Sequence, residues 1–345
     1  RLEGLDKITP ELPSICQGAD ISFDEKTMKK INQTMLAQGF DEIITSSLVG
    51  ENLCTIFMQP LNKEKMVKVK NAHSEDFCIL RQKLMPNMLE VVKSNFDNGN
   101  KNFRLYEAGK VYIKEGEITQ DETGVLEERF LTGAIFGNVN NSLYNVQKDD
   151  FYTLKGVLES LFDKLGLSKR VVYKAFSEED TKNYEFLHPA QSALISILGQ
   201  NKEPIGYLGK LHPVLADKLK FNQDLYIFEI NLEEVIKSIN EQTHKFKKLP
   251  VYGAVYRDIA LLADKNTTVE DVNKVIKKVA DKNIFKSSKV FDVYEGEGID
   301  ENKKSLAFRI TLQDENKTLT DEAIQSEINK IKAGLEKNII GLTLR

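Results

Sequence analysis

The stretch Thr268-Val-Glu-Asp-Val-Asn-Lys-Val-Ile-Lys-Lys-Val279 decides how the C-terminal part of this chain folds. Its first four residues have the form of a capping box, in which a threonine and an acidic residue three positions later begin a helix. Apolar residues then recur at helical spacing. A helix is therefore expected directly after a strand that contains Ile259 and Leu261.

Two alternating strands and a second helix follow this first helix. The strands are expected over residues 289–294 and 305–313, with a glycine-rich turn between them. Isoleucine and leucine residues from Ile324 to Leu335 recur at spacings of four, three and four, which predicts the second helix. Residues 339–344 predict a last strand. The order β-α-β-β-α-β over residues 246–345 is the ferredoxin-like arrangement, a fold that hosts many functions.

Residues 16–238 predict a different architecture, an α+β module. A β-rich run from Glu42 to Val49, further strand-like runs at residues 103–107, 110–113 and 130–136, and an amphipathic helix from Leu154 to Leu165 belong to it. A polar segment without an apolar period follows, and we interpret residues 239–245 as a linker. The first residue is Arg1 rather than an initiator Met, which suggests a piece of a longer chain.

Composition and residue spacing exclude several classes of protein. The chain is 41% hydrophobic and 29% charged, as folded globular proteins are, and no apolar run approaches the roughly 20 residues that span a bilayer. The cysteines and histidines are too scattered for a disulfide framework or a metal site, so we expect no metal ligands and a reducing, cytoplasmic location. Residues 246–345 hold 18 Lys and Arg against 16 Asp and Glu, which permits an RNA contact without indicating one.

Several strings resemble the β chain of bacterial-type phenylalanyl-tRNA synthetases. In the first two thirds they are Arg1-Leu-Glu-Gly-Leu-Asp-Lys-Ile8, Asn71-Ala-His-Ser-Glu-Asp76, Arg104-Leu-Tyr-Glu107, Phe151-Tyr-Thr-Leu-Lys-Gly156, Phe186-Leu-His-Pro189 and Leu208-Gly-Lys-Leu-His-Pro213. In the last third they are Tyr256-Arg-Asp-Ile-Ala-Leu261, Phe291-Asp-Val-Tyr294, Lys304-Ser-Leu-Ala-Phe308 and Thr318-Leu-Thr-Asp321. They occur in the family's order over nearly the whole chain.

The resemblance implies three parts. Residues 1–15 would be the tail of an upstream helical domain, residues 16–238 a degenerate class II synthetase-like module with a mixed or antiparallel sheet, and residues 246–345 a ferredoxin-fold anticodon-binding domain. It further implies a catalytic α subunit as partner in an α2β2 assembly, the tRNA for phenylalanine as ligand, and ATP and magnesium as cofactors of the holoenzyme. The family's magnesium ligands and its editing domain would lie before residue 1.

The residues themselves argue against catalysis by this chain. Class II adenylation places arginines on the ATP phosphates, where charge develops, in the patterns F-R-x-E and G-x-G-x-x-R. Here Phe103-Arg104-Leu-Tyr-Glu107 has one residue too many, which sends the carboxylate to the opposite face of a strand. The second pattern is absent before the linker. We therefore expect no catalytic residue, and interpret Arg104 and Glu107 as a surface or interface pair.

The candidate binding residues lie on the ferredoxin-like sheet. If Phe291 and Val293 face the helices, alternation turns Asp292 and Tyr294 to the open face. There Tyr294 can stack on an unpaired base and Asp292 can accept from guanine N1–H and N2–H, although Asp292 is equally compatible with a solvated strand carboxylate.

The family's anticodon contacts fall on Ala260, Asp292, Tyr294 and Ser305. Arg257 and Arg309 are candidate phosphate contacts, and alternation does not decide which face Arg257 occupies.

Two other interpretations stay open at this stage. The chain could be an independently acting synthetase, like the single-chain organellar form that fuses an active module to the same anticodon domain. The missing arginine patterns speak against it. It could also be a free-standing RNA-binding or regulatory protein, which only the presence or absence of an α-subunit partner distinguishes from a β subunit.

Overall fold

The computed structural model describes residues 4, 7–11, 18, 20–59, 61–116, 123–138, 148–199, 203–239, 249–296, 298–300, 302–339 and 341–344. The chain divides into two compact units, residues 1–242 and 243–345. The expected linker, apart from Ile239, and most of the expected tail at residues 1–15 lie outside the described residues, so these boundaries stay predictions. Among the helices that the structure describes, none combines the length and apolar character needed to cross a bilayer.

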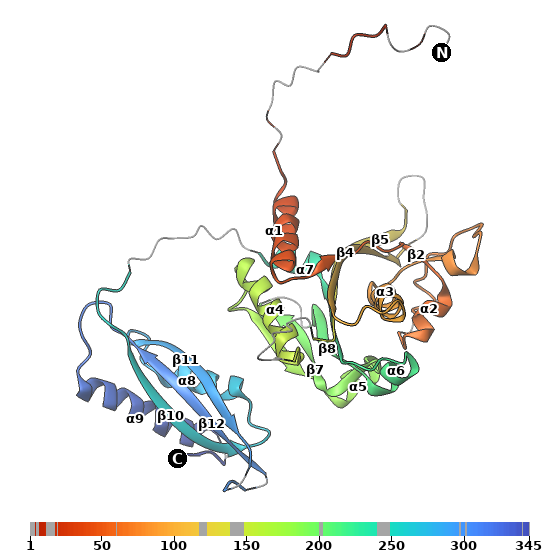
Figure 1. Ribbon diagram of the computed structural model, residues 1–345. Helices are drawn as coiled ribbons and strands as arrows, with labels where there is room; N and C mark the ends of the chain where they lie inside the picture. Colours follow the sequence, from red (N-terminus) through yellow and green to blue (C-terminus); the bar gives the residue numbers. More distant parts are fainter. Residues whose placement is uncertain are drawn as a thin grey trace. The chain divides into compact units, whose positions relative to one another are not determined.

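A seven-stranded sheet forms the centre of the first unit (Figure 1). In sheet order its strands are β1 (Asp41–Glu42), β4 (Phe103–Lys114), β5 (Val125–Phe136), β9 (Leu225–Asn231), β8 (Gly206–Leu211), β7 (Leu187–Ile197) and β6 (Val171–Ala175). The β1–β4 pair is parallel and the other neighbouring pairs are antiparallel. The expected α+β module with a mixed or antiparallel sheet is confirmed, and the sheet is mixed.

Helices cover both faces of this sheet. The first face packs against α1 (Phe23–Ala37), α4 (Phe151–Lys164) and α7 (Leu232–Ser238). The second packs against α3 (Met85–Asp97) and α6 (Pro213–Lys218). Alternation along β5 shows the division, because Leu131 and Ile135 enter the first core while Ala134 and Phe136 enter the second. The remaining elements are α2 (Glu51–Ile56), α5 (Glu178–Asn183), a 3₁₀ turn at Glu75–Phe77, and a small sheet of β2 (Leu48–Val49) and β3 (Ile79–Leu80).

Two strand predictions for this unit are corrected. The run from Glu42 to Val49 is not one strand, because β1 pairs with β4 in the large sheet whereas β2 pairs with β3 in the small one. The runs 103–107 and 110–113 form the single strand β4, which passes through Gly109 without a break. A side chain at Gly109 would place its Cβ 2.5 Å from Arg81 Nη2, so this glycine provides space for Arg81 rather than a turn.

The second unit has the expected β-α-β-β-α-β order. Its sheet order is β11 (Phe285–Tyr294), β12 (Lys303–Leu312), β10 (Val255–Asp264) and β13 (Thr343–Leu344), and its helices are α8 (Val269–Val279) and α9 (Asp321–Asn338). The capping box begins α8, with the Asp271 amide donating to Thr268 Oγ1 at 3.1 Å. Both helices pack on one face of the sheet (Figure 1), where Ile276 and Ile331 meet Phe308. The ferredoxin-like prediction is confirmed.

Candidate functional site

The arginines of the first unit are engaged by the protein itself. Residues 16–238 contain four. Arg81 contacts Glu107 at 2.9 Å, Arg104 contacts Asp149 at 2.8 Å, Arg129 contacts Glu233 at 2.7 Å and Asp24 at 2.6 Å, and Arg170 donates to the carbonyls of Ser238 at 2.9 Å and Leu198 at 3.0 Å. A phosphate would have to displace these acceptors, so none of the four is arranged to bind ATP.

Arg104 and Glu107 lie on opposite faces of β4, as their spacing predicts. Arg104 shares the face of Tyr106 in the first core, whereas Glu107 shares the face of Leu105 in the second. Both are buried, with 9% and 2% of their surface exposed. The interpretation of the two as a surface or interface pair is therefore wrong: each belongs to a separate buried network.

Glu229, on β9, is another buried carboxylate, and its side chain contacts the N-terminus of α3. It accepts hydrogen bonds from the amides of Leu84 at 2.9 Å and Met85 at 2.8 Å, and from the hydroxyl of Tyr207 at 3.4 Å. Burial raises the pKa of Glu229 above its ordinary value, against the lowering effect of these bonds. The carboxylate thus satisfies amide groups at the α3 N-terminus, and its role is to hold α3 on the sheet.

The histidine–proline pairs have local structural roles. His212 is the N-cap of α6, where its Nδ1 accepts from the Val214 amide at 3.2 Å. His188 lies at the irregular start of β7, and its Nδ1 accepts from the Ala190 amide at 3.1 Å. In both residues the unprotonated ring nitrogen, which a general base would use to accept a proton, is thus occupied by a backbone hydrogen bond.

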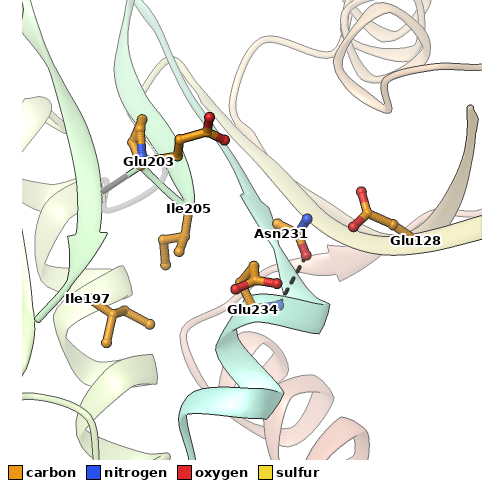
Figure 2. Close-up of a pocket in the computed structure, with 7 residues that line it drawn as sticks. Glu128, Ile197, Glu203, Ile205, Asn231 and Glu234 are labelled. Atoms are coloured by element: carbon orange, nitrogen blue, oxygen red, sulfur yellow. Dashed lines mark hydrogen bonds between the residues drawn. The ribbon is translucent and has the colours of Figure 1, made fainter. Parts of the chain in front are cut away.

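A cavity of about 250 Å³ opens beside β9 in the first unit, lined by Glu128, Ile197, Glu203, Pro204, Ile205, Asn231 and Glu234 (Figure 2). Asn231 Oδ1 accepts from the Glu234 amide at 3.2 Å and begins α7. The charged side chains of the lining are three glutamates, so the cavity repels a polyphosphate. Among the described residues no group of three His, Cys, Asp or Glu side chains is placed to hold a metal ion.

The open face of the second sheet, opposite α8 and α9, brings most of the candidate binding residues together. Strand register places Tyr294 opposite Ser305, and Asp292 in a row with Ala307 and Ala260. Since Leu306 and Phe308 on β12 are buried against the helices, the alternate residues Ser305, Ala307 and Arg309 point to the open face. Small side chains therefore occupy the centre of the face, with an aromatic ring and a carboxylate on its β11 edge.

The ring of Tyr294 lies against the turn that follows β11. It is 45% exposed. At Gly296 an added Cβ would lie 2.9 Å from Tyr294 Oη and 3.1 Å from Cζ, so any side chain there would displace the ring. Gly296 is thus a positioning residue that the sequence shows only as part of a glycine-rich turn.

The two candidate arginines lie on different faces. Arg257 is opposite Ile310 on the helix side, and its Nη2 is 3.4 Å from Asp321 at the start of α9. It is therefore not part of the open face, and its contact with phosphate remains a prediction. Arg309 is on the open face, directly opposite Asp258, which binds it through two hydrogen bonds of 2.8 and 2.7 Å.

Simple alternation predicts that Phe291 faces the helices, but the structure places it on the open face. The β11–β12 register shifts between Val290 and Asp292, so Phe291 is the additional residue of a β-bulge. It is 52% exposed, and the guanidinium of Arg309 lies over its ring with Cζ 5.1 Å from the centroid. Sequence reasoning missed Phe291 and Asp258 as open-face residues because neither the bulge nor the register has a local sequence signal.

Comparison with known proteins finds a matching family for each of the two units. The family described as "Phenylalanyl tRNA synthetase beta chain CLM domain" matches residues 8–232, and that described as "Ferredoxin-fold anticodon binding domain" matches residues 250–345. The phenylalanine–tRNA ligase beta subunit of Clostridium tetani is 33% identical over 349 residues, covering 100% of this chain and 41% of that protein. That of Carboxydothermus hydrogenoformans is 34% identical over 310 residues, covering 89% and 37%.

Among solved structures, a pyrrolysyl tRNA synthetase from Desulfitobacterium hafniense is similar with a TM-score of 0.44 and 13% identity, over 63% of this chain and 72% of that one.

The two units match a phenylalanyl-tRNA synthetase β-chain CLM domain followed by an anticodon-binding domain of the ferredoxin fold. The chain belongs to the phenylalanyl-tRNA synthetase β-chain family. The resemblance of the quoted strings is thereby confirmed. The chain spans about two fifths of the length of the curated relatives it matches, 41% and 37% for the two above.

Proposed function

We propose that this chain is part of the non-catalytic β subunit of a cytoplasmic phenylalanine–tRNA ligase. It would assemble with a catalytic α subunit, as α2β2, and bind the anticodon of the tRNA for phenylalanine. The proposed contacts are Ala260, Asp292, Tyr294 and Ser305 on the open face, with Arg309 beside them. The observation that carries the proposal is the gathering of Tyr294 and Asp292 around small side chains, on a domain of an anticodon-binding family.

The chemistry of this face suits unpaired bases. An exposed tyrosine ring provides a stacking surface for any base, because every base has a π-face. A strand carboxylate beside the ring accepts from the Watson–Crick edge of guanine, which is accessible only when the base is unpaired. The neighbouring Ala260 and Ala307 leave room for the base to reach that carboxylate.

The first unit argues against catalysis by this chain. ATP and magnesium would bind at the α subunit. The described residues here do not fit ATP, because every arginine of the module is held by protein oxygens and the cavity beside β9 is lined by glutamates, which repel its phosphates. Among the same residues no group of three His, Cys, Asp or Glu side chains is placed to hold magnesium. The same arginines disfavour the independently acting synthetase.

Purified without an α chain, this chain should show no phenylalanine-dependent ATP–pyrophosphate exchange, because no arginine is placed for the phosphates. Exchange above background in an α-free preparation would make the independently acting synthetase the better reading. Co-expression with the α chain, followed by size-exclusion chromatography, distinguishes a β subunit from a free-standing RNA-binding protein. Co-elution with the α chain supports a subunit. Separate elution with retained tRNA binding supports a free-standing RNA-binding protein.

Replacing Asp292 with alanine should narrow the preference for cognate tRNA over a tRNA whose first anticodon guanine is replaced. A base-edge contact contributes discrimination of about 1–3 kcal/mol, or roughly 5- to 150-fold, whereas backbone contacts contribute none. Binding isotherms with both tRNAs measure this. Glu322→Ala removes an exposed carboxylate from α9 and should leave the preference intact. An unchanged preference in a folded Asp292→Ala protein would mean that Asp292 is a solvated strand carboxylate.

A further inference from the structure

The β-bulge in β11 leaves a large aromatic side chain in solvent. Val290 pairs with Phe308 and Asp292 with Ala307, so Phe291 between them has no partner in the ladder. Bulges redirect a side chain, and here the bulge directs Phe291 to the face that carries Asp292 and Tyr294. The ring is therefore not part of the core and is accessible to a ligand on this face.

Arg309 is held in a defined orientation beside this ring. Asp258 accepts from Nε at 2.8 Å and from Nη2 at 2.7 Å, a bidentate arrangement that fixes the plane of the guanidinium. The hydrogen bond to Asp258 raises the pKa of Arg309, and the same bond lowers the pKa of Asp258. Because Asp258 compensates its charge, Arg309 is a poor phosphate contact. What it presents is a flat cationic surface over Phe291.

The three residues come from three adjacent strands. Phe291 is on β11, Arg309 on β12 and Asp258 on β10, so the cluster depends on the register of the whole sheet. Side-chain exposure of Arg309 is 52%, and Phe291 is exposed to the same degree, which leaves planar surface accessible to a ligand. Phe291 and Tyr294 are three residues apart on β11, roughly 10 Å at the rise of a strand.

We propose that Phe291, Arg309 and Asp258 form a second base-stacking subsite on the open face. It would take a further unpaired nucleotide of the RNA strand whose guanine is bound at Asp292 and Tyr294. Unpaired bases stack on aromatic rings and on guanidinium planes, and such stacking tolerates any base. The subsite therefore contributes affinity without sequence preference, and Arg309 acts by stacking rather than through a phosphate. The inference rests on the proposed function of the open face.

The test uses the full chain and an anticodon stem-loop RNA with 2-aminopurine at one of the three anticodon positions in turn. Phe291→Ala and Arg309→Ala should each weaken binding about tenfold or more. Each of these two variants should change the 2-aminopurine fluorescence at one anticodon position, and Tyr294→Ala should change it at a different anticodon position. The slope of log K against log salt should stay unchanged, because no phosphate contact is lost. Phe291→Tyr keeps the ring and should bind as the wild type does.

Lys289→Ala is the matched control for Arg309→Ala, because Lys289 lies directly opposite Arg309 on β11 and its loss is the same change of charge. A purely electrostatic effect would weaken binding equally in both variants, and would count against the stacking role. A salt slope reduced by about 0.7–0.9 in Arg309→Ala, with all three fluorescence signals unchanged, would identify a phosphate contact and overturn the proposal.

The same variants also distinguish failure of the second subsite from failure of the proposed anticodon site. If Tyr294→Ala weakens binding while folded Phe291→Ala changes neither affinity nor fluorescence, the second subsite does not exist and the anticodon site stands. If none of the variants, Tyr294→Ala included, changes binding, the open face is not the RNA site and both proposals fail.

Discussion

Replacing Arg81 with alanine should destabilise the first unit by about 3–5 kcal/mol, the usual cost of leaving one partner of a buried ion pair alone. Arg81 is 4% exposed and donates from Nη1 to Glu107 at 2.9 Å and to Thr45 Oγ1 at 2.7 Å, and from Nε to the Lys110 carbonyl at 2.9 Å. The variant leaves the buried Glu107 carboxylate without its cation. Urea unfolding measures the loss by circular dichroism at 222 nm, because the chain has no Trp for fluorescence.

Two controls make this result specific. The double variant Arg81→Met, Glu107→Leu removes both charges and should recover about half or more of the lost stability, since apolar replacement of a whole buried pair is often nearly neutral. Lys68→Ala breaks the exposed pair with Glu51 and should leave the transition unchanged. A loss below about 1 kcal/mol in Arg81→Ala would contradict the buried network.

Replacing Tyr294 with alanine should weaken tRNA binding by about tenfold or more, because a base–aromatic stack contributes about 1–3 kcal/mol. Tyr294 is 45% exposed, so the loss of its side chain removes a contact surface with little effect on the core. Cognate tRNA and the tRNA lacking the first anticodon guanine should lose affinity to similar degrees, since stacking carries little sequence information. Binding isotherms of the full chain measure both.

The position of the ring can be tested separately from its presence. Gly296→Ala keeps Tyr294 but places a Cβ 2.9 Å from its hydroxyl, so it should weaken binding in the same direction as Tyr294→Ala. Gly253→Ala is the matched change, because nothing lies within 4 Å of a Cβ at that position. Tyr294→Phe keeps the ring and should bind normally. Wild-type affinity in both Tyr294→Ala and Gly296→Ala would remove Tyr294 from the RNA site.

Charged side chains are arranged differently in the two units. In the first unit, Arg81 and Arg104 form buried ion pairs with Glu107 and Asp149, and Arg129 forms a partly exposed pair with Glu233. There they stabilise the packing of helices on both faces of the sheet. The second unit keeps one sheet face uncovered, and its exposed aromatic and charged groups are available to a ligand.

The order of elements followed from the sequence alone, because it depends on local patterns. The capping box at Thr268 and the apolar periods of α8 and α9 predicted both helices, and alternation predicted β11 and β12. The spacing of Arg104 and Glu107 was enough to place them on opposite faces of a strand, since side chains alternate with a period of two. The ends of strands were predicted less accurately. The run from Glu42 to Val49 divides into β1 and β2 because each pairs with a different strand remote in sequence.

The partners of the charged and aromatic groups were decided only by the tertiary structure. Arg309 meets Asp258 because β10 and β12 pair in one register, and a shift by one residue would have turned Asp258 to the helices. Phe291 reaches the open face because a bulge interrupts the alternation from which its position was predicted. The face of Arg257 likewise follows from its pairing with Ile310. A sequence specifies the order of side chains along a strand, but which of them meet depends on how separate strands align.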